Sequence, residues 1–227
     1  IQNLWISEKN ILYSYKDGEK KIFCTVSQSK SPILKILQTV DQRIFIGTFS
    51  SGVFVIDQNK KIRSVLQGSS QVANLFEDSR KNVWISTWEN GLYKIDRNGN
   101  IVRYVHQPGN PEKSLSSNFV RVVCEDNNGS LWVGTKKGLD HLNPETGVFK
   151  HYGSEGYNDR NLSNESVWSL LKDNQGTIWA GTYFGGVNYF NPEINSYTSH
   201  NLQNGELLNK PFPIISNIVE DEYHNLY

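Results

Sequence analysis

Three short stretches of the sequence bring aromatic or charged side chains together after a shared Gly-Thr or Ser-Thr pair. They are Trp88 with Glu89, Lys136 with Lys137, and Tyr183 with Phe184. Aromatic planes stack on the apolar faces of sugars, and neighbouring carboxylate, amide and ammonium groups bond sugar hydroxyls. We therefore treat these side chains as ligand-binding candidates. The competing interpretation is that each aromatic ring packs beneath an adjacent loop.

Two further candidates lie outside these stretches. Trp168 lies in a strand-like segment, where it either lines a central channel or packs in the core. Arg160 lies with Tyr157 and Asp159 in a long polar segment, for which a solvated loop is the simpler expectation.

Motifs for catalysis or metal binding are missing from the sequence. The five histidines (His106, His141, His151, His200 and His224) show no H-x-x-x-H spacing, and no paired C-x-x-C occurs. Asp126–Gly129 resembles the start of a calcium loop but lacks the closing glutamate, and its repetition indicates turn chemistry. Carboxylates for glycoside hydrolysis would have to converge from distant segments. We expect no catalytic residue, no metal and no cofactor.

The candidates sit within a motif that recurs along the chain. Its cleanest copy is Asp173–Asn191, and similar copies are Asp126–Asn143, Asp78–Asp96 and Arg43–Asp57. The central aromatic residues are Trp5, Phe45, Trp84, Trp132, Trp179 and Tyr227, whose numbers differ successively by 40, 39, 48, 47 and 48. Intervals of roughly 20–50 residues are typical of repeat architectures.

Each copy supplies four short strand candidates rather than helices. In the cleanest repeat they are Ser166–Leu171, Thr177–Thr182, Val187–Phe190 and Ser196–Ser199. Evenly spaced four-stranded antiparallel units with an aromatic–glycine signature describe the blades of a β-propeller. Because a blade is covered on both faces, its strands are continuously apolar. We therefore expect the repeated tryptophans to pack in the core.

The fold class is thus predicted to be all-β, a β-propeller fragment of about five four-stranded antiparallel blades in a single domain, residues 1–227. Blades are expected at about 1–26 (partial), 33–66, 71–105, 118–152, 165–200 and 214–227 (partial). The partial ends either close a ring of about five blades or belong to an open arc. We favour the arc, because the residues after Asp221 begin a new repeat. The tail Ile214–Asp221 is expected to be a first strand, and Asn225–Tyr227 begins a second.

Loop length marks one face of this disc. The long connections His106–Ser117, Gly153–Asn164 and Asn201–Pro213 join an outer strand to the next inner strand. In an antiparallel blade they emerge on the same side as the turns that carry the ligand-binding candidates. Function on such scaffolds is carried by loops.

Composition excludes several classes of protein. The chain has 227 residues, 37% of them hydrophobic, which suffices for one sizeable core. Lys+Arg 23 balances Asp+Glu 23 without a basic stripe, so we expect no nucleic-acid binding by this fragment. No apolar run approaches the roughly 20 residues of a membrane span.

With no methionine, the chain is interpreted as a piece of a longer protein. Cys124 is expected in the core, with no disulfide to Cys24.

Two segments carry a family resemblance. Asp126–Leu139 and Asp173–Val187 resemble the two-component regulator propeller repeat, and the preceding Ser114–Val120 and Asn161–Val167 resemble its linker. Departures are Phe45 in place of tryptophan, Lys81 and His224 in place of a turn glycine, and Ser86 in place of the strand glycine. These departures are interpreted as ordinary drift between repeats.

The resemblance implies the periplasmic sensor region of a hybrid two-component system, the ectodomain of an inner-membrane protein. Such proteins carry two seven-bladed propellers and a small β-sandwich domain outside the membrane. A membrane helix, a histidine kinase, a receiver and a DNA-binding module follow. They typically sense oligosaccharides from complex glycans. The fragment would then be non-catalytic and would meet the membrane only through its parent.

Three functions remain open at this stage. The first is a sensor propeller that binds an oligosaccharide. The second is a propeller lyase or hydrolase, because some propeller lyases carry a similar D-x-x-G-x-x-W turn; it requires titratable side chains that meet at one channel mouth. The third is an interaction scaffold that docks onto a neighbouring propeller or β-sandwich domain of the parent, or onto a second copy as a homodimer.

Overall fold

The computed structural model describes residues 4–68, 70–153, 161–191, 196–200 and 216–227 of the chain. Within these residues the strands form one three-stranded and four four-stranded antiparallel sheets. The strands of each sheet follow one another in sequence order, so hairpins join all neighbours. This is the all-β, bladed architecture that the repeats predict.

The first sheet, blade 1, contains β1 (Leu4–Glu8), β2 (Ile11–Lys16) and β3 (Glu19–Thr25). Blade 2 contains β4 (Ile33–Gln38), β5 (Ile44–Thr48), β6 (Val53–Ile56) and β7 (Ile62–Leu66). Blade 3 contains β8 (Val72–Glu77), β9 (Val83–Thr87), β10 (Leu92–Ile95) and β11 (Ile101–Tyr104). Blade 4 contains β12 (Val120–Glu125), β13 (Leu131–Thr135), β14 (Gly138–Asn143) and β15 (Val148–Tyr152). Blade 5 contains β16 (Val167–Lys172), β17 (Ile178–Thr182), β18 (Gly186–Asn191) and β19 (Ser196–His200). A 3-10 turn, η1 (Pro111–Lys113), lies in the connection between blades 3 and 4.

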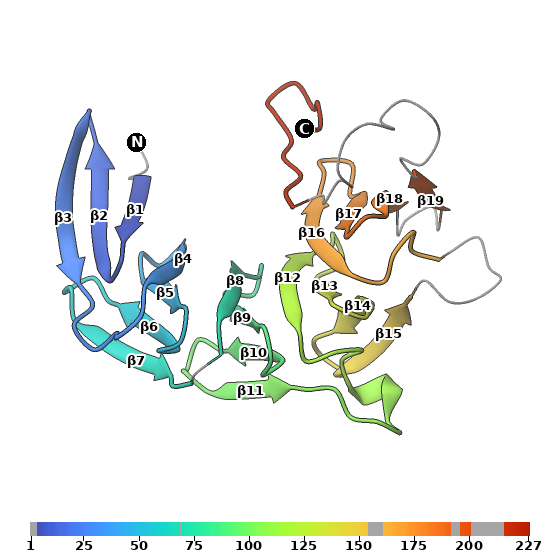
Figure 1. The fold of residues 1–227 in the computed structure, drawn as a ribbon, viewed down its shortest axis with the longest axis horizontal. Coiled ribbons are helices and arrows are strands. Elements are labelled where there is room, and N and C mark those ends of the chain that lie inside the picture. The colour runs from blue at the N-terminus through green and yellow to red at the C-terminus, as the bar shows by residue number, and fades with distance from the viewer. Residues whose placement is uncertain (1–3, 69, 154–160, 192–195, 201–215) are drawn as a thin grey trace.

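The blades are arranged as an open arc (Figure 1). The first strands β4, β8, β12 and β16 contact one another in series on the inner side, and β7, β11 and β15 lie on the outer side. Blade 1 lies at one end of the arc, where β1 pairs only with β2 among the described residues. The C-terminal segment, which lies near β16, does not pair with β1. The described chain therefore does not close a ring.

The core is divided among the interfaces between neighbouring blades. One cluster joins Trp84 and Leu92 of blade 3 to Val123, Leu131 and Val133 of blade 4. The next joins Trp132 of blade 4 to blade 5, and two further clusters join blades 1 to 2 and 2 to 3. Since β13 sends Leu131 and Val133 to one neighbour and Trp132 to the other, all of its residues are buried. This two-sided burial is the reason for its uninterrupted apolar sequence.

Two glycines permit the inner strands to approach one another closely. A Cβ at Gly47 would lie 2.4 Å from Val72 Cγ1 of the next blade, and a Cβ at Gly134 would lie 2.8 Å from Val167 Cγ1. Real Cβ atoms do not approach neighbours that closely, so a side chain would push the blades apart. At both positions a glycine in the second strand of one blade lets the inner strand of the next blade approach closely.

Each repeat also locks its own first turn. In blade 3 the carboxylate of Asp78 accepts hydrogen bonds from the Asn82 backbone N–H and from Trp84 Nε1, both at 2.8 Å. The same aspartate-to-tryptophan bond measures 3.2 Å for Trp132 with Asp126 and 2.7 Å for Trp179 with Asp173. The repeated Asp and Trp are therefore structural, as the turn interpretation predicts.

A further repeated contact ties each blade to the one before it. The last residue of an inner strand reaches the first turn of the preceding blade. Glu77 accepts from the Val40 N–H at 2.8 Å, and Glu125 accepts from the N–H and hydroxyl of Ser79 at 2.7 Å. Lys172 donates to Asn127 Oδ1 at 2.9 Å. We call these contacts the inter-blade clasps.

The tail differs from the expected strand. Residues 214 and 215 lie outside the described residues, and residues 216–227 form only an isolated bridge between Glu220 and Leu226. Asp221 nevertheless accepts from the Asn225 N–H and the Tyr227 hydroxyl. The described part of the tail thus forms the turn of the repeat but not the expected strand.

Candidate functional site

The inner strands share an irregularity that reorients side chains toward the centre of the arc. In β4, β8, β12 and β16 the pairing with the following strand skips the second residue, which is a β-bulge. The skipped residues are Leu34, Ala73, Arg121 and Trp168. Bulges bend a strand and redirect its side chains, and they are common beside binding sites. The bulge is repeated, whereas its residue changes in every blade.

A hollow of about 300 Å³ lies at these bulges, which we call the central hollow. All four inner strands line it, and Trp88 at the end of β9 and Ser216 and Asn217 of the tail complete its wall. A volume near 300 Å³ is at the small end of the range for ligand pockets, which is about 300–1,000 Å³.

Arg121 and Trp168 form the most distinctive wall of the central hollow. The guanidinium of Arg121 lies over the indole of Trp168, 4.4 Å from the ring centroid. Its Nη1 donates to Ser166 Oγ at 2.9 Å and to the Val167 carbonyl at 3.0 Å. Half-burial lowers the pKa of Arg121 from its ordinary value, because desolvation disfavours the charged form. The arrangement offers a cation and an aromatic plane side by side.

The aromatic wall continues beyond the central hollow. The ring of Tyr183 stacks on Trp168 with centroids 5.9 Å apart, and Phe184 contacts Tyr183 at 3.9 Å. Phe184 is exposed and occupies positive φ in the β17–β18 turn. Trp168, Tyr183 and Phe184 therefore form one continuous aromatic surface from the hollow to the turn. The sequence-based prediction did not anticipate that Trp168 and Tyr183 stack.

The remaining candidates are distributed differently. Trp88 is 38% exposed and lines the central hollow, whereas Glu89 is exposed and lies outside its wall. Lys136 holds its ammonium 5.1 Å from the Phe119 ring centroid, and Lys137 is exposed. Neither lysine lines the central hollow. Arg160 lies outside the described residues.

Sequence reasoning overlooked Lys35, Asn74 and Arg121, which also line the central hollow. A signal for them was present in the sequence. Each lies one or two residues after the β-branched residue that begins an inner strand, where the repeats differ most (Leu-Lys, Ala-Asn, Arg-Val and Trp-Ser). The sequence-based prediction chose the turn after the Gly-Thr pair because that turn carries aromatic residues. The bulge in the inner strand is defined by the pairing register between two strands, which the sequence does not show.

The acid–base groups that a lyase or hydrolase needs do not line the central hollow. Among the described residues of its wall, only Lys35 and Arg121 are ionisable at neutral pH, and neither carboxylates nor histidines occur. In the described part of the chain, no group of three or more His, Cys, Asp or Glu side chains could hold a metal ion. The hollow is suited to binding polar and aromatic-stacking ligands.

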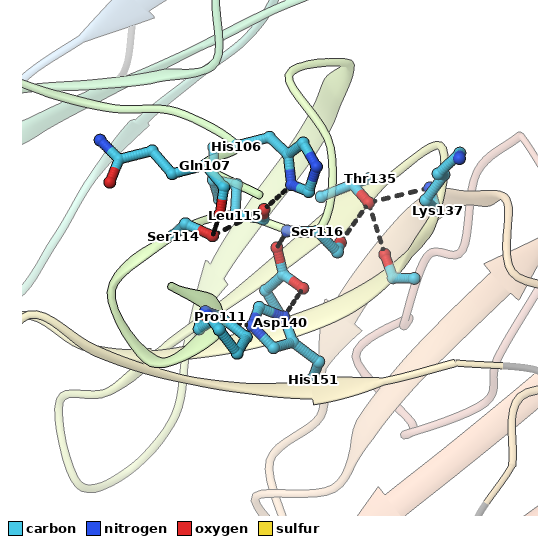
Figure 2. A network of polar contacts seen from close by, with 11 residues as sticks. His106, Gln107, Pro111, Ser114, Leu115, Ser116, Thr135, Lys137, Asp140 and His151 are labelled. Atoms are coloured by element: carbon cyan, nitrogen blue, oxygen red, sulfur yellow. Dashed lines mark hydrogen bonds and ion pairs between the residues drawn. The ribbon is translucent and has the colours of Figure 1, made fainter. Parts of the chain in front are cut away.

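A second polar cluster combines a serine, a histidine and a buried aspartate, the residue types of a nucleophilic triad (Figure 2). His151 donates from Nδ1 to Asp140 Oδ1 at 2.7 Å and from Nε2 to the Pro111 carbonyl at 2.8 Å. The Ser116 hydroxyl instead pairs with Thr135, and its N–H donates to Asp140. Since both nitrogens of His151 are committed, the imidazole cannot act as a base toward Ser116.

This cluster instead fastens the long connection between blades 3 and 4. His151 contacts η1 through the Pro111 carbonyl, and Asp140 holds the backbone of Ser116. The hydrogen bond to Asp140 favours the charged imidazolium and therefore raises the pKa of His151 above its ordinary value. With hydrogens on both nitrogens, His151 is a cationic bridge between the connection and blade 4 (Figure 2).

Comparison with known proteins agrees with the bladed fold. Residues 114–137 and 161–184 match the family described as Two component regulator propeller. These segments span the connection, the inner strand and the first turn of blades 4 and 5. No curated protein sequence matches the chain. No helix in the described part of the chain has the length and hydropathy that a membrane span requires.

Solved structures with a similar fold include sensor ectodomains and a lyase. The extracellular domain of a protein described as a hybrid two-component system from B. thetaiotaomicron is 25% identical with a TM-score of 0.67, over 87% of this chain and 26% of that one. A second such domain from the same organism is 20% identical with a TM-score of 0.56, over 99% and 36%. Virginiamycin B lyase from Staphylococcus aureus is 15% identical with a TM-score of 0.66, over 93% and 68%. The chain thus spans about a quarter to a third of the two ectodomains, and the last two matches establish the fold alone.

Proposed function

We propose that this chain, a β-propeller segment with two-component regulator propeller repeats, belongs to the periplasmic sensor region of a hybrid two-component system and binds an oligosaccharide in its central hollow. Two observations support the placement. The repeats match a regulator family, and the solved structure at 25% identity is an extracellular domain of such a system. A kinase, a receiver and a membrane anchor would be contributed by the parent protein.

The observation that carries the ligand proposal is the wall of the central hollow. Trp88 and Trp168 present indole surfaces to a space of about 300 Å³, and Lys35 and Asn74 add polar groups from neighbouring blades. Sugar recognition combines stacking on apolar ring faces with hydrogen bonds to hydroxyls. A ligand bound in the central hollow would contact several blades at once and would therefore link them to one another.

The test is a titration of the purified chain with a panel of oligosaccharides, monitored by tryptophan fluorescence and calorimetry. Because Trp88 and Trp168 line the central hollow, binding should change the fluorescence saturably. Trp88→Ala should weaken binding at least about fivefold, if stacking of a sugar on an aromatic ring matches the about 1–3 kcal/mol of a stacked nucleobase. Phe49→Ala is the matched control, because Phe49 is exposed at the equivalent place in blade 2 but does not line the hollow. Equal loss in both variants, or no saturable binding at all, would reject the proposal.

A second candidate function is docking onto another domain of the parent or onto a second copy of the chain. It is favoured by the exposed apolar side chains of blade 1 and the tail, among them Leu4 (59% exposed), Ile22 (66%) and Tyr227 (77%). Such side chains at the ends of an open arc suit a neighbouring propeller or β-sandwich domain. Ile22→Glu should abolish any self-association seen by sedimentation velocity while leaving oligosaccharide binding intact. Association unchanged in that variant would argue against this surface.

A further inference from the structure

We infer that the oligosaccharide bound in the central hollow is anionic and carries carboxylate or sulfate groups. This inference rests on the proposed function, because it specifies the chemistry of the ligand for the same site. It is carried by an imbalance of charge in the wall of the hollow and by the position of the cation responsible.

Both ionisable side chains of the described wall are cationic. Lys35 comes from β4 and Arg121 from β12, and among the described residues no aspartate or glutamate lines the hollow. The ion pairs among the described residues do not involve either side chain. Arg121 donates only to neutral oxygens of Ser166, Val167 and Thr135. No carboxylate among the described residues neutralises this half-buried guanidinium, so its charge is available to an anion in the hollow.

The charge is not required by the repeat. At the bulge position of Arg121, the other blades carry Leu34, Ala73 and Trp168 with the same skip in register. Blades of the same geometry thus form with neutral residues there. A guanidinium is also suited to carboxylate and sulfate, because its planar donors match two anion oxygens at once. The specific occurrence of arginine at this bulge therefore points to a ligand rather than to the blade.

The remainder of the wall suits the sugar to which the anion is attached. The Trp168 ring beneath Arg121 and the indole of Trp88 offer stacking surfaces. In the described part of the chain, Trp168 Nε1 and Asn74 Oδ1 are buried without a hydrogen-bond partner, and both residues line the hollow. Leaving such groups unpaired destabilises the folded chain, so these two atoms mark a part of the wall that lacks polar partners.

The competing explanation is that Arg121 serves only as a strut between β12 and β16 through its bonds to Ser166 and Val167. A strut contributes to stability and does not distinguish acidic from neutral sugars. A binding cation does distinguish them, and it does so more weakly as salt screens the attraction. The two roles are therefore separable by ligand selectivity.

The experiment compares matched pairs of ligands on the intact chain. One pair is a trigalacturonate and its neutral, carboxyl-reduced form, and the other is a sulfated galactan tetrasaccharide with and without its sulfates, of which the desulfated form is neutral. We expect the acidic member of at least one pair to bind about tenfold tighter or more, with the difference shrinking between 50 and 500 mM salt. Which pair shows selectivity identifies the anion as carboxylate or sulfate.

Variants assign the selectivity to the wall. Arg121→Gln and Lys35→Gln should each reduce the ratio of acidic to neutral affinity, whereas Lys150→Gln, an exposed cation on β15, should leave it unchanged. Lys35 is exposed, so Lys35→Gln tests the inference even if Arg121→Gln fails to fold. Neutral and acidic members that bind equally would overturn the inference and leave the proposed function standing. Absence of binding by every member of both pairs would overturn the proposed function, and the inference with it.

Discussion

At the scale of single residues, the repeated tryptophans of blades 3, 4 and 5 are each held by the aspartate that begins their own turn, whereas Trp5 donates to Gln38. Trp84 is fully buried, and its indole N–H would be an unpaired donor in the core without Asp78. The same carboxylate also binds Asn82 through its backbone and side chain. One residue thus shapes the turn and satisfies the core, which is why the two residue types recur together.

Asp78→Ala should destabilise the chain by about 3 kcal/mol, because it removes charge-assisted hydrogen bonds and leaves the buried indole N–H unsatisfied. Asp96→Ala is the matched control. Asp96 makes turn bonds to Asn98 and Asn100 but is only partly buried and has no tryptophan partner. The control should destabilise the chain much less than Asp78→Ala. Urea unfolding measures both, and equal losses would show that the tryptophan bond contributes nothing.

Backbone strain is also set at single positions. Gly129 and Gly176 occupy positive φ in the first turns of blades 4 and 5, with φ of 75° and 82°. At the equivalent positions Gln42, Lys81 and His224 have φ of 66°, 68° and 65°. The replacement of the turn glycine by Gln42, Lys81 or His224 therefore does not change the conformation of the turn. It only requires a non-glycine residue to adopt positive φ, which is less favourable.

At the scale of elements, the connection between blades 3 and 4 is docked by one charged bridge. Asp140 is fully buried in β14 and stands where β18 has Asn188. Asn188 accepts from the Ser163 N–H just as Asp140 accepts from the Ser116 N–H. Asp140 additionally holds His151, which extends to η1. Asp140 and Asn188 thus make the same contact to the connection before their blade. The carboxylate of Asp140 adds a second contact, to the titratable side chain of His151.

This bridge should make stability depend on pH. The pKa of His151 is raised above its ordinary value of 6.5 in the folded chain. The contribution of the charged His151 to the free energy of unfolding is therefore fully present below pH 6.5. It is lost as the pH rises through the raised pKa of the folded chain. The melting temperature should fall by a few degrees between pH 6 and pH 9, and digestion of the connection by protease should become faster.

Asp140→Asn is the control variant, because Asn188 shows that an amide is accommodated at this position in blade 5. The variant removes the main cause of the raised pKa of His151, so the fall in melting temperature between pH 6 and pH 9 should become smaller. A pH dependence identical to that of the unmodified chain would show that His151 and Asp140 are not its source.

At the scale of the whole molecule, the arc is a row of blades in which each contacts only its neighbours. Four core clusters occupy the four junctions between five blades, and the inter-blade clasps repeat at each later junction. Stability in such a row is approximately the sum of the blades and the junctions between them. A blade with one junction is therefore expected to open more readily than a blade with two.

Hydrogen exchange should reveal this gradient along the arc. Blade 1 has three described strands and a single neighbour, and Leu12 is the one fully buried residue of these strands. Backbone amides of β2 should exchange at least about tenfold faster than those of β13, which is buried throughout. Both peptides are measured in the same sample, so β13 is the internal reference. Equal protection of β2 and β13 would contradict a row of separately stabilised blades.

The sequence by itself determined the blades and their cores. Residues at the same place in every copy, such as Trp84 and Trp132 or Gly47 and Gly134, perform the same structural task in each. Their physical roles are local or depend on the nearest blade, so spacing and residue type were sufficient. The aromatic candidates Trp88, Trp168 and Tyr183 were also identifiable, because they interrupt the repetition.

Only the tertiary structure decided which side chains share the central hollow. Lys35, Asn74, Arg121 and Trp168 are separated by about 40 residues or more along the chain and meet because every inner strand carries the same bulge. A bulge is a mismatch between two paired strands, so one strand's sequence does not reveal it. The stacking of Trp168 on Tyr183 and the charge imbalance around Arg121 follow from that pairing. For this reason the scaffold was predictable residue by residue, whereas the site emerged only when the blades were set side by side.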